Sequence, residues 1–517
     1  MPELHQFYGG MKLPGHKSES LVRDLQQASL PPQLFLPLQQ HIGEHNKPLV
    51  NIGDRVLKGD IIAANASPIC AAVHAPTSGR VSAIAKFPVA HPSGLADTCI
   101  VIDVDGEDEA AAAVLPDLQR LDAQQMIELI CRAGIVGLGG AAFPTSAKLA
   151  RGKMQGIETL IINGVECEPY ITCDDMLMRN YAAEVLRGSG YLQRILQPQT
   201  TLIGIEDNKP EAIRAMTAAL AQTGLTQTEI VAIPTIYPSG GEKQLIQILT
   251  GKEVPHGQLA FDIGLFCQNV GTCVAITRAL EQDQPLISRV VTISGDNIRQ
   301  PGNWEVALGT PIRHLLELAG GYLHSDTAHL VMGGPMMGFS LASDQVPIVK
   351  ASNNIMVMRE QTIPHSPGFH DECIRCSKCT EVCPASLLPQ QLYWHTRARA
   401  WDRTQEFHLF DCIECGCCSA VCPSGIPLVQ YYRAAKSEIR AAQKAQAKSD
   451  HARLRFEFRE RRLHRKQQQE EERRRLKREA LQQKRAKAGD DTSVADPVQA
   501  ALERVKARKQ AAQEESS

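Results

Sequence analysis

The chain has 517 residues and a formal net charge of −2, and it is 43% hydrophobic and 22% charged. This composition is typical of a globular protein, and the length allows roughly three or four domains. No apolar run reaches about 18 residues, so we expect no transmembrane span. The first 14 residues lack the apolar stretch of a secretory signal.

Sixteen cysteines are too many to be incidental in a chain of this size. A disulfide framework would require export, and nothing at the start of the sequence directs export. We therefore expect a reduced, cytosolic protein whose clustered cysteines bind metal.

The first third of the chain is predicted to be β-rich. Residues 1–30 form an extended lead-in with glycines and a proline. Residues 31–115 alternate apolar residues with regularly spaced glycines, which predicts short strands in a small β-sandwich or barrel.

Residues 120–287 are predicted to form an α/β domain with a mostly parallel sheet, because helical stretches alternate with apolar strands. The helices are expected at residues 122–133, 210–222 and 241–249, and the strands at 159–163, 201–205 and 230–233.

The rest of the chain divides into three segments. Residues 288–350 return to β-structure with one helix at 311–319, and residues 365–432 hold the clustered cysteines. Residues 433–517 are rich in charged residues and Ala, and their stretch 451–490 is strongly basic. We interpret this tail as a solvated charged helix or a disordered segment; contact with anionic lipid or another subunit is the alternative. The fold class is therefore a multidomain combination of α/β and α+β parts.

Two cysteine runs have identical spacing, Cys-x-x-Cys-x-x-Cys-x-x-x-Cys-Pro. The first consists of Cys373, Cys376, Cys379 and Cys383, and the second of Cys412, Cys415, Cys418 and Cys422. This is the run that ligates [4Fe–4S] clusters in two-cluster ferredoxins, where the cysteine before proline ligates the other cluster. Cluster 1 is thus expected on Cys373, Cys376, Cys379 and Cys422, and cluster 2 on Cys412, Cys415, Cys418 and Cys383.

A pair of zinc sites is the alternative. Zinc sites use four ligands, often as two separate cysteine pairs, and do not explain two four-cysteine runs that each end in proline. Cys417 is an extra cysteine next to Cys418. The regular spacing favours Cys418 as the ligand, and Cys417 is expected to be a neutral thiol near the cluster.

A Gly-rich segment at 134–148 precedes a helix and ends in Lys148. Such turns let backbone amides approach a phosphate, to which Lys148 could add a positive charge. Alone the pattern is weak, because Gly-rich loops without a phosphate are common. The interpretation of the Gly-rich segment as a ligand-binding turn is supported by three further polar segments, at 163–169, 239–243 and 269–272. Each of these segments alone is interpreted as a helix cap or a turn.

These four segments together resemble, in order, the flavin- and NADH-binding 51-kDa subunit family of respiratory complex I. The resemblance implies that FMN is surrounded by Gly137, Gly139, Gly140, Lys148, Asn163, Glu166, Gly241, Glu242, Asn269 and Thr272. It also implies that Phe143 and Glu168 face the nicotinamide nucleotide. The sequence departs from that family's pattern at Leu138, Val165, Lys243 and Gly271.

Additional motifs narrow the resemblance to the RnfC family, the C subunits of the Rnf/Rsx ion-translocating electron transport complex, over about residues 1–435. They include Phe-Tyr-Gly-Gly at 7–10, Ala-Pro-Thr-Ser-Gly-Arg-Val at 75–81, Gly-Gly-Pro-Met-Met-Gly at 333–338 and the double cluster run. The β-module resembles lipoyl/biotinyl-type barrel-sandwich domains, and residues 288–350 resemble a soluble-ligand-binding β-grasp module. Residues 496–509 resemble a single copy of the repeats that end longer members.

The resemblance implies a peripheral, NADH-linked oxidoreductase/translocase subunit at the cytoplasmic face of the bacterial inner membrane. Electrons would pass from NADH to FMN, to two [4Fe–4S] clusters and to integral membrane subunits, with no nucleic acid among the partners. Two alternatives stay open. One is a soluble flavin/iron–sulfur reductase, such as a cobalamin reductase, and the other is a non-catalytic cluster relay whose flavin site has decayed at Leu138, Val165 and Gly271.

Overall fold

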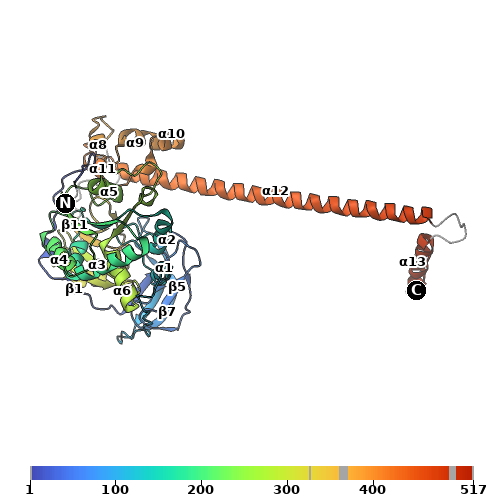
Figure 1. Ribbon diagram of the computed structural model, residues 1–517, viewed down its shortest axis with the longest axis horizontal. Helices are drawn as coiled ribbons and strands as arrows, with labels where there is room; N and C mark the ends of the chain where they lie inside the picture. The colour runs from blue at the N-terminus through green and yellow to red at the C-terminus, as the bar shows by residue number, and fades with distance from the viewer. Residues whose placement is uncertain (1–2, 325–327, 360–370, 488–496, 515–517) are drawn as a thin grey trace. The chain divides into compact units, whose positions relative to one another are not determined.

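The structure is a computed structural model that describes residues 3–324, 328–359, 371–487 and 497–514 (Figure 1). It divides into two compact units, Met1–Lys436 and Ser437–Ser517. The predicted start of the cysteine-bearing segment at residue 365, and the start of the repeat-like segment at residue 496, lie outside the described residues.

A β-module opens the first unit with two antiparallel sheets. One sheet has the order β2-β8-β7-β4, with bounds Gln33–Pro37, Ala96–Val104, Gly79–Pro88 and Arg55–Val56. The other has the order β3-β5-β6, with bounds Lys47–Pro48, Ile61–Ala64 and Val73–His74. Leu34 and Leu36 alternate along β2 and are fully buried, as expected for a strand with one face on a core. The predicted small β-sandwich is confirmed.

The α/β domain follows, and its four-stranded sheet is entirely parallel in the order β11-β10-β9-β12. The strands span Thr228–Ile233, Thr200–Glu206, Thr159–Gly164 and Leu265–Asn269. Helices α1 to α6 span Ala123–Arg132, Thr145–Gln155, Cys173–Leu196, Pro210–Leu220, Glu242–Thr250 and Val270–Gln282, and the short helix η2 spans Ala260–Ile263. The sequence encodes the start of α1 directly, because Asp122 and Gln125 form a reciprocal capping box.

The order of this sheet determines where a ligand can bind. The chain runs from β9 outward through β10 to β11 and then returns to the opposite side of β9 as β12. The direction of winding therefore reverses between β9 and β12. In open α/β sheets, ligands bind at such a reversal, beyond the carboxyl ends of the strands.

The third part is a six-stranded sheet in the order β1-β14-β13-β17-β15-β16. Strands β13 to β17 span Ser288–Ser294, Gly302–Ala307, Ala328–Met332, Phe339–Ser340 and Asn354–Arg359, and helix α7 spans Ile312–Leu318. The sheet thus extends beyond the segment 288–350 that the sequence indicates. Strand β1 (Gln26–Gln27) pairs in parallel with β14, so the N-terminal lead-in contributes an edge strand after the short helix η1 (Glu19–Leu21).

The cysteine-bearing segment is helical and completes the first unit. Its elements are α8 (Lys378–Glu381), α9 (Pro389–Arg397), α10 (Trp401–Glu406), η5 (Leu409–Asp411) and α11 (Cys417–Ala420). Helix α12 (Leu428–Lys487) begins in the first unit. Its residues Tyr432 and Ala435, which belong to the first unit, are buried.

The second unit contains most of α12 and the helix α13 (Pro497–Glu514). The tail is therefore helical wherever it is described, which agrees with the first of the two expectations for it. Among the described residues, no helix combines the length and the apolar character that crossing a membrane requires.

Candidate flavin and iron–sulfur sites

Two asparagines mark the reversal point of the parallel sheet. Asn163 near the end of β9 and Asn269 at the end of β12 are partners in register. The Asn269 carboxamide oxygen accepts a hydrogen bond from the Gly271 amide at 2.8 Å and so caps α6. The Asn163 oxygen accepts from the Val165 amide at 2.9 Å, and its nitrogen donates to the Gly240 carbonyl at 3.0 Å.

The predicted Gly-rich loop lies against this pair. A methyl group added at Gly139 would lie 3.4 Å from the Cβ of Asn269, and Gly140 has open space and a φ of +108°. The Leu138 amide donates to the Thr272 hydroxyl at 3.0 Å. The structure therefore brings the predicted residues Gly139, Gly140, Asn269 and Thr272 together.

The base of the loop is closed by its own backbone. The Gly137 amide donates to the Phe143 carbonyl at 2.8 Å, and the Ala142 amide donates back to the Gly137 carbonyl at 3.2 Å. Phe143 is half-buried beside the start of α2. This closure leaves Gly139 and Gly140 exposed at the tip, where their backbone can approach a ligand.

The second predicted glycine turn lies on the other side of Asn163. A methyl group at Gly240 would be 2.8 Å from the Val165 carbonyl oxygen, so only glycine fits there. The neighbouring Gly241 is the N-cap residue of α5. Lys148, expected to add charge for a phosphate, instead donates to Glu242 at 2.8 Å and to the Cys267 carbonyl at 2.7 Å.

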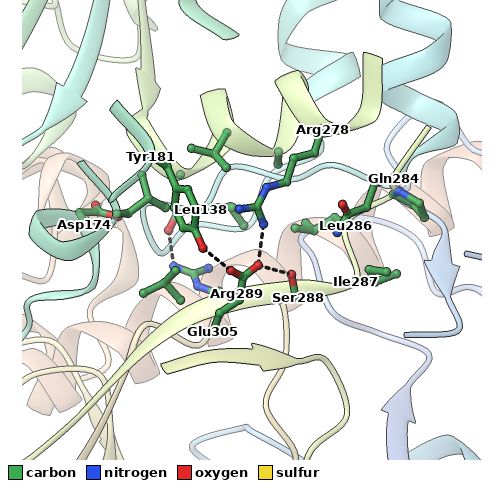
Figure 2. A pocket seen from close by; sticks show the side chains of 16 residues that line it. Leu138, Asp174, Tyr181, Arg278, Gln284, Leu286, Ile287, Ser288, Arg289 and Glu305 are labelled. Carbon is green, nitrogen blue, oxygen red and sulfur yellow. Dashed lines mark hydrogen bonds and ion pairs between the residues drawn. The ribbon is translucent and has the colours of Figure 1, made fainter. Parts of the chain in front are cut away.

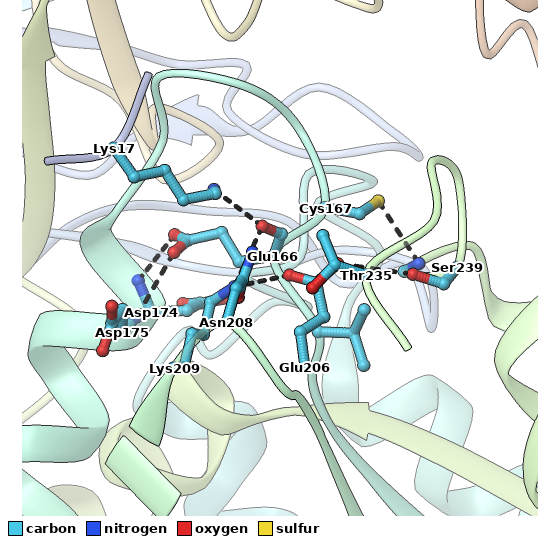
Figure 3. A network of polar contacts seen from close by, with 12 residues as sticks. Lys17, Glu166, Cys167, Asp174, Asp175, Glu206, Asn208, Lys209, Thr235 and Ser239 are labelled. Atoms are coloured by element: carbon cyan, nitrogen blue, oxygen red, sulfur yellow. Dashed lines mark hydrogen bonds and ion pairs between the residues drawn. The ribbon is translucent and has the colours of Figure 1, made fainter. Parts of the chain in front are cut away.

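A buried polar network supports the segment after β9 (Figure 3). Lys17 donates to the carbonyls of Glu166 at 2.8 Å, Glu168 at 2.9 Å and Ile171 at 2.5 Å. The Glu166 carboxylate accepts from the Asp174 amide at 2.8 Å and so holds the start of α3. Burial lowers the pKa of Lys17. Burial and the nearby Glu166 carboxylate raise the pKa of Asp174.

The same network reaches the end of β10. Lys209 and Glu206 form a fully buried ion pair, and Lys209 also donates to the Glu166 carbonyl at 3.3 Å. Figure 3 shows both side chains pointing toward the Glu166 segment. Sequence reasoning did not single out Lys17, Asp174, Glu206 or Lys209 as site residues. Glu206 ends β10 and Lys209 follows it closely, whereas Asp174 lies at the start of α3 and Lys17 in the lead-in. These positions are the signal that the sequence offered.

Glu168, expected to face a nucleotide, has protein partners. Its carboxylate accepts from the amides of Met336 at 2.7 Å and Met337 at 3.0 Å. These amides belong to the glycine motif at 333–338, and a methyl group at Gly334 would lie 2.0 Å from the Glu168 Cγ. Burial raises the pKa of Glu168. Glu168 therefore joins the α/β domain to the six-stranded sheet.

Two buried basic side chains bind the carbonyls of the Gly-rich loop. Lys350 donates to the carbonyls of Ala72 and Gly134, both at 2.6 Å, and Arg289 donates to the Leu138 carbonyl at 2.6 Å. Both side chains come from the third part of the unit, and Ala72 belongs to the β-module. The loop is thus fixed by contacts from both neighbouring parts.

A small cavity beneath Leu138, about 40 Å³, separates the loop from β13 and β14. Figure 2 shows Tyr181, Arg278 and Ser288 converging on the carboxylate of Glu305. The Tyr181 hydroxyl donates to Glu305 at 2.7 Å, and the Arg278 guanidinium lies 4.7 Å from the Tyr181 ring centroid. These polar groups bind one another, so the cavity wall supports the loop from below.

Lys350→Met should change the pH dependence of stability. Burial lowers the pKa of Lys350 to about 7, whereas an unfolded lysine titrates near about 10.4. Between these two pKa values, unfolding therefore takes up a proton at Lys350. The contribution of Lys350 to the free energy of unfolding rises with pH, by up to about 1.4 kcal/mol per pH unit. Urea unfolding of the cluster-loaded protein from pH 7 to pH 9 should show this slope in the wild type, and the slope should be absent in the variant.

Lys86→Met, at an exposed position, is the matched control for Lys350→Met. Parallel plots of unfolding free energy against pH for the wild type and Lys350→Met would contradict the assignment.

The cysteines line two separate cavities. One is lined by Cys373, Cys376, Cys379 and Cys422. The other is lined by Cys383, Cys412, Cys415 and Cys418. Each cavity thus holds four thiols, three from one run and the last from the other, which suits the four-thiolate ligation of a [4Fe–4S] cluster. These are the sets that the sequence predicts.

The backbone of the two runs repeats as the sequence does. Left-handed residues occur at Arg375, Ser377 and Ser386 in the first run, and at positions 39 residues later in the second, namely Glu414, Gly416 and Gly425. Each run therefore wraps its cavity with the same turns. Cys417 is fully buried beside Tyr237 and Cys415, and it does not line the second cavity.

The second run packs against the α/β domain. The Tyr237 hydroxyl donates to the Cys415 carbonyl at 2.6 Å. A methyl group at Gly416 would be 2.6 Å from the Met336 carbonyl oxygen. Tyr237 lies just before the Gly240–Gly241 turn, so the same loop contacts the candidate flavin residues and the second cysteine run.

Taken together, a flavin-type α/β domain with a candidate site at the reversal of its sheet, joined to two four-cysteine cavities, defines an iron–sulfur flavoprotein of electron transfer. Profiles of known protein families match in the same order. They are the RnfC barrel sandwich hybrid domain at residues 5–107, the Nuo51 FMN-binding domain at 130–278, the SLBB domain at 290–340 and the 4Fe-4S dicluster domain at 372–426. FMN and two [4Fe–4S] clusters are the cofactors that these domains imply, and the two cavities fit the clusters.

Curated relatives match over nearly the whole chain. The C subunit of the ion-translocating oxidoreductase complex of Pectobacterium atrosepticum is 49% identical over 99% of this chain and 72% of its own length. The Serratia proteamaculans protein of the same name is 48% identical over 98% of this chain and 70% of its own length. The chain belongs to this family, the C subunits of the ion-translocating oxidoreductase complex.

Solved structures are more distant. An NAD⁺-reducing [NiFe]-hydrogenase in the H₂-reduced state aligns with 63% of this chain and 67% of its own, with 17% identity and a TM-score of 0.42.

Proposed function

We propose that this chain is the NADH-oxidising subunit of a membrane-bound, ion-translocating oxidoreductase complex. Integral membrane subunits of the same complex hold it at the cytoplasmic face of the bacterial inner membrane and receive its electrons. The observation that carries the proposal is the Tyr237–Cys415 contact, because it joins the second cysteine run to the loop that leads into the Gly240–Gly241 turn of the candidate flavin site.

The residues of the candidate flavin site have distinct parts in this proposal. Bound FMN supplies the conversion of a hydride into single electrons, and the clusters carry single electrons. Gly139, Gly140 and Gly241 let the backbone approach the flavin phosphate and ring, while Asn163 and Asn269 present amides at the strand ends. The remaining predicted contacts are Gly137, Lys148, Glu166, Glu242 and Thr272.

The proposal also assigns two residues to the nicotinamide nucleotide. Phe143 is half-buried at the base of the Gly-rich loop and offers a ring for stacking. Glu168 is bound to the amides of Met336 and Met337, so it positions the adjoining loop as well. We propose that the nicotinamide nucleotide enters between these two residues.

Cofactor analysis of the purified chain tests the function. The cluster-loaded protein should contain flavin and iron, and NADH should bleach the flavin absorbance under anaerobic conditions. Gly139→Val should lose flavin and keep iron, because its side chain fills the space beside Asn269. Gly224→Ala is the matched control, since nothing lies within 4 Å of the position of its added methyl group. Intact clusters with no flavin and no response to NADH would overturn the proposal.

A further inference from the structure

A group of three metal-ligating side chains lies outside the sites described so far. His256 comes from the segment between α5 and η2 of the α/β domain. His408 and Asp411 come from the turn that precedes Cys412. One ligand atom from each of the three lies within 4.8 Å of the other two.

The local backbone aligns the two residues of the turn. His408 has a φ of +58° and caps the one-turn helix η5 at Leu409–Asp411. This turn brings His408 and Asp411, three residues apart, to the same side of the chain. His256 meets them from the neighbouring domain, with its Nδ1 in contact with a carboxylate oxygen of Asp411. The two imidazole rings lie edge to face with centroids 4.6 Å apart.

The chemistry of this donor set favours a transition-metal ion. Two imidazoles and one carboxylate are ligands of Zn²⁺, with bond lengths of about 2.0–2.2 Å. Atoms within 4.8 Å of one another need only a small closure to reach a common ion at such distances. The side chain of His256 is 58% exposed, so further coordination positions are open to water. Calcium and magnesium prefer oxygen ligands and fit this set poorly.

We propose that His256, His408 and Asp411 bind a divalent transition-metal ion of the Zn²⁺ type. The ion would connect the α/β domain to the residue immediately before Cys412, and so fasten the second cysteine run to the flavin-bearing domain. Lys243 lies 3.7 Å from the other oxygen of Asp411 and holds that carboxylate in the absence of metal. This proposal does not depend on NADH as the substrate.

Zinc titration of the intact protein tests the site. The chain is used with both clusters loaded, and its cluster absorbance is followed so that no cysteine is released. Calorimetry should show one Zn²⁺ per chain, and Zn²⁺ should raise the unfolding temperature. His256→Gln and His408→Gln should each weaken binding more than about tenfold, as expected when a metal site loses a ligand.

His329→Gln serves as the matched control. His329 is a half-buried histidine on β15 whose side chain hydrogen-bonds Ser340. It lies far in sequence from the three residues, and its replacement should leave zinc binding unchanged. The proposal is overturned if the loaded wild type binds no Zn²⁺. It is also overturned if Zn²⁺ binding and the rise in unfolding temperature survive in His256→Gln. The same holds if His329→Gln weakens Zn²⁺ binding as much as His256→Gln does.

Discussion

Cys422→Ser should remove one of the two clusters, and the cluster it removes should be that of the first run. The Cys422 thiol lines the cavity of Cys373, Cys376 and Cys379, although it belongs to the second run in sequence. Iron per purified chain should fall by about half, because each cluster needs four thiolates. Iron analysis together with the electron paramagnetic resonance spectrum of the reduced protein measures the loss.

Paired replacements distinguish crossed from uncrossed ligation. If Cys422 and Cys373 serve the same cluster, the double variant should retain as much iron as either single variant. If Cys422 and Cys412 serve different clusters, their double variant should retain almost none. Such non-additivity is the expected signature of residues that act on one shared group. The reverse pattern would show that each run holds its own cluster.

Cys417→Ser is the control for both experiments. Cys417 is adjacent to the predicted ligand Cys418 and fully buried, but it does not line the second cavity. Its replacement should leave iron content unchanged. Iron loss in this variant equal to that in Cys418→Ser would contradict the assignment.

Lys209→Met should lower the free energy of unfolding by about 3–5 kcal/mol, the usual cost of removing one partner of a buried ion pair. Lys209 and Glu206 have no exposed surface, so the variant leaves the Glu206 carboxylate without its cation. Flavin content should fall as well, because Lys209 also donates to the Glu166 carbonyl. Urea unfolding and flavin content per chain measure the two effects.

Two comparisons isolate the cause of this loss. Adding Glu206→Gln to Lys209→Met removes the unpaired charge and should recover much of the stability. Lys252→Met breaks an exposed ion pair with Glu158 in the same domain and should cost at most about 1 kcal/mol. If Lys209→Met costs no more than Lys252→Met, the buried pair does not support the site.

The sequence predicts the features whose information is local. The cysteine spacing identifies the two cluster-binding runs, because the cysteines of each run lie within a few backbone turns of one another. The parallel strands could be predicted from their apolar runs, and Asn163 and Asn269 of the candidate flavin site lie near the ends of two of them. Resemblance to known families placed these residues in one site.

The contacts that fix the site depend instead on distant residues. Glu168 binds Met336, which is 168 residues further along the chain. Lys350 reaches Gly134 across 216 residues. A buried lysine and an exposed one look alike in sequence, because burial is determined by what packs over them. Strand β1 is two glutamines long and gives no apolar pattern, so its pairing with β14 could not be predicted.

The N-terminal segment has a consequence for how the protein is assembled. The Gly10 amide donates to the Val382 carbonyl, and Met11 pairs with Tyr237 through backbone hydrogen bonds. Gly10 and Met11 thus complete a surface that includes the cluster-bearing segment, which is made several hundred residues later. Contacts of such high sequence separation form slowly, because the intervening chain must first be ordered. During synthesis the N-terminal segment therefore docks only after most of its partners have been made. We expect its docking to be among the last steps in the folding of the first unit.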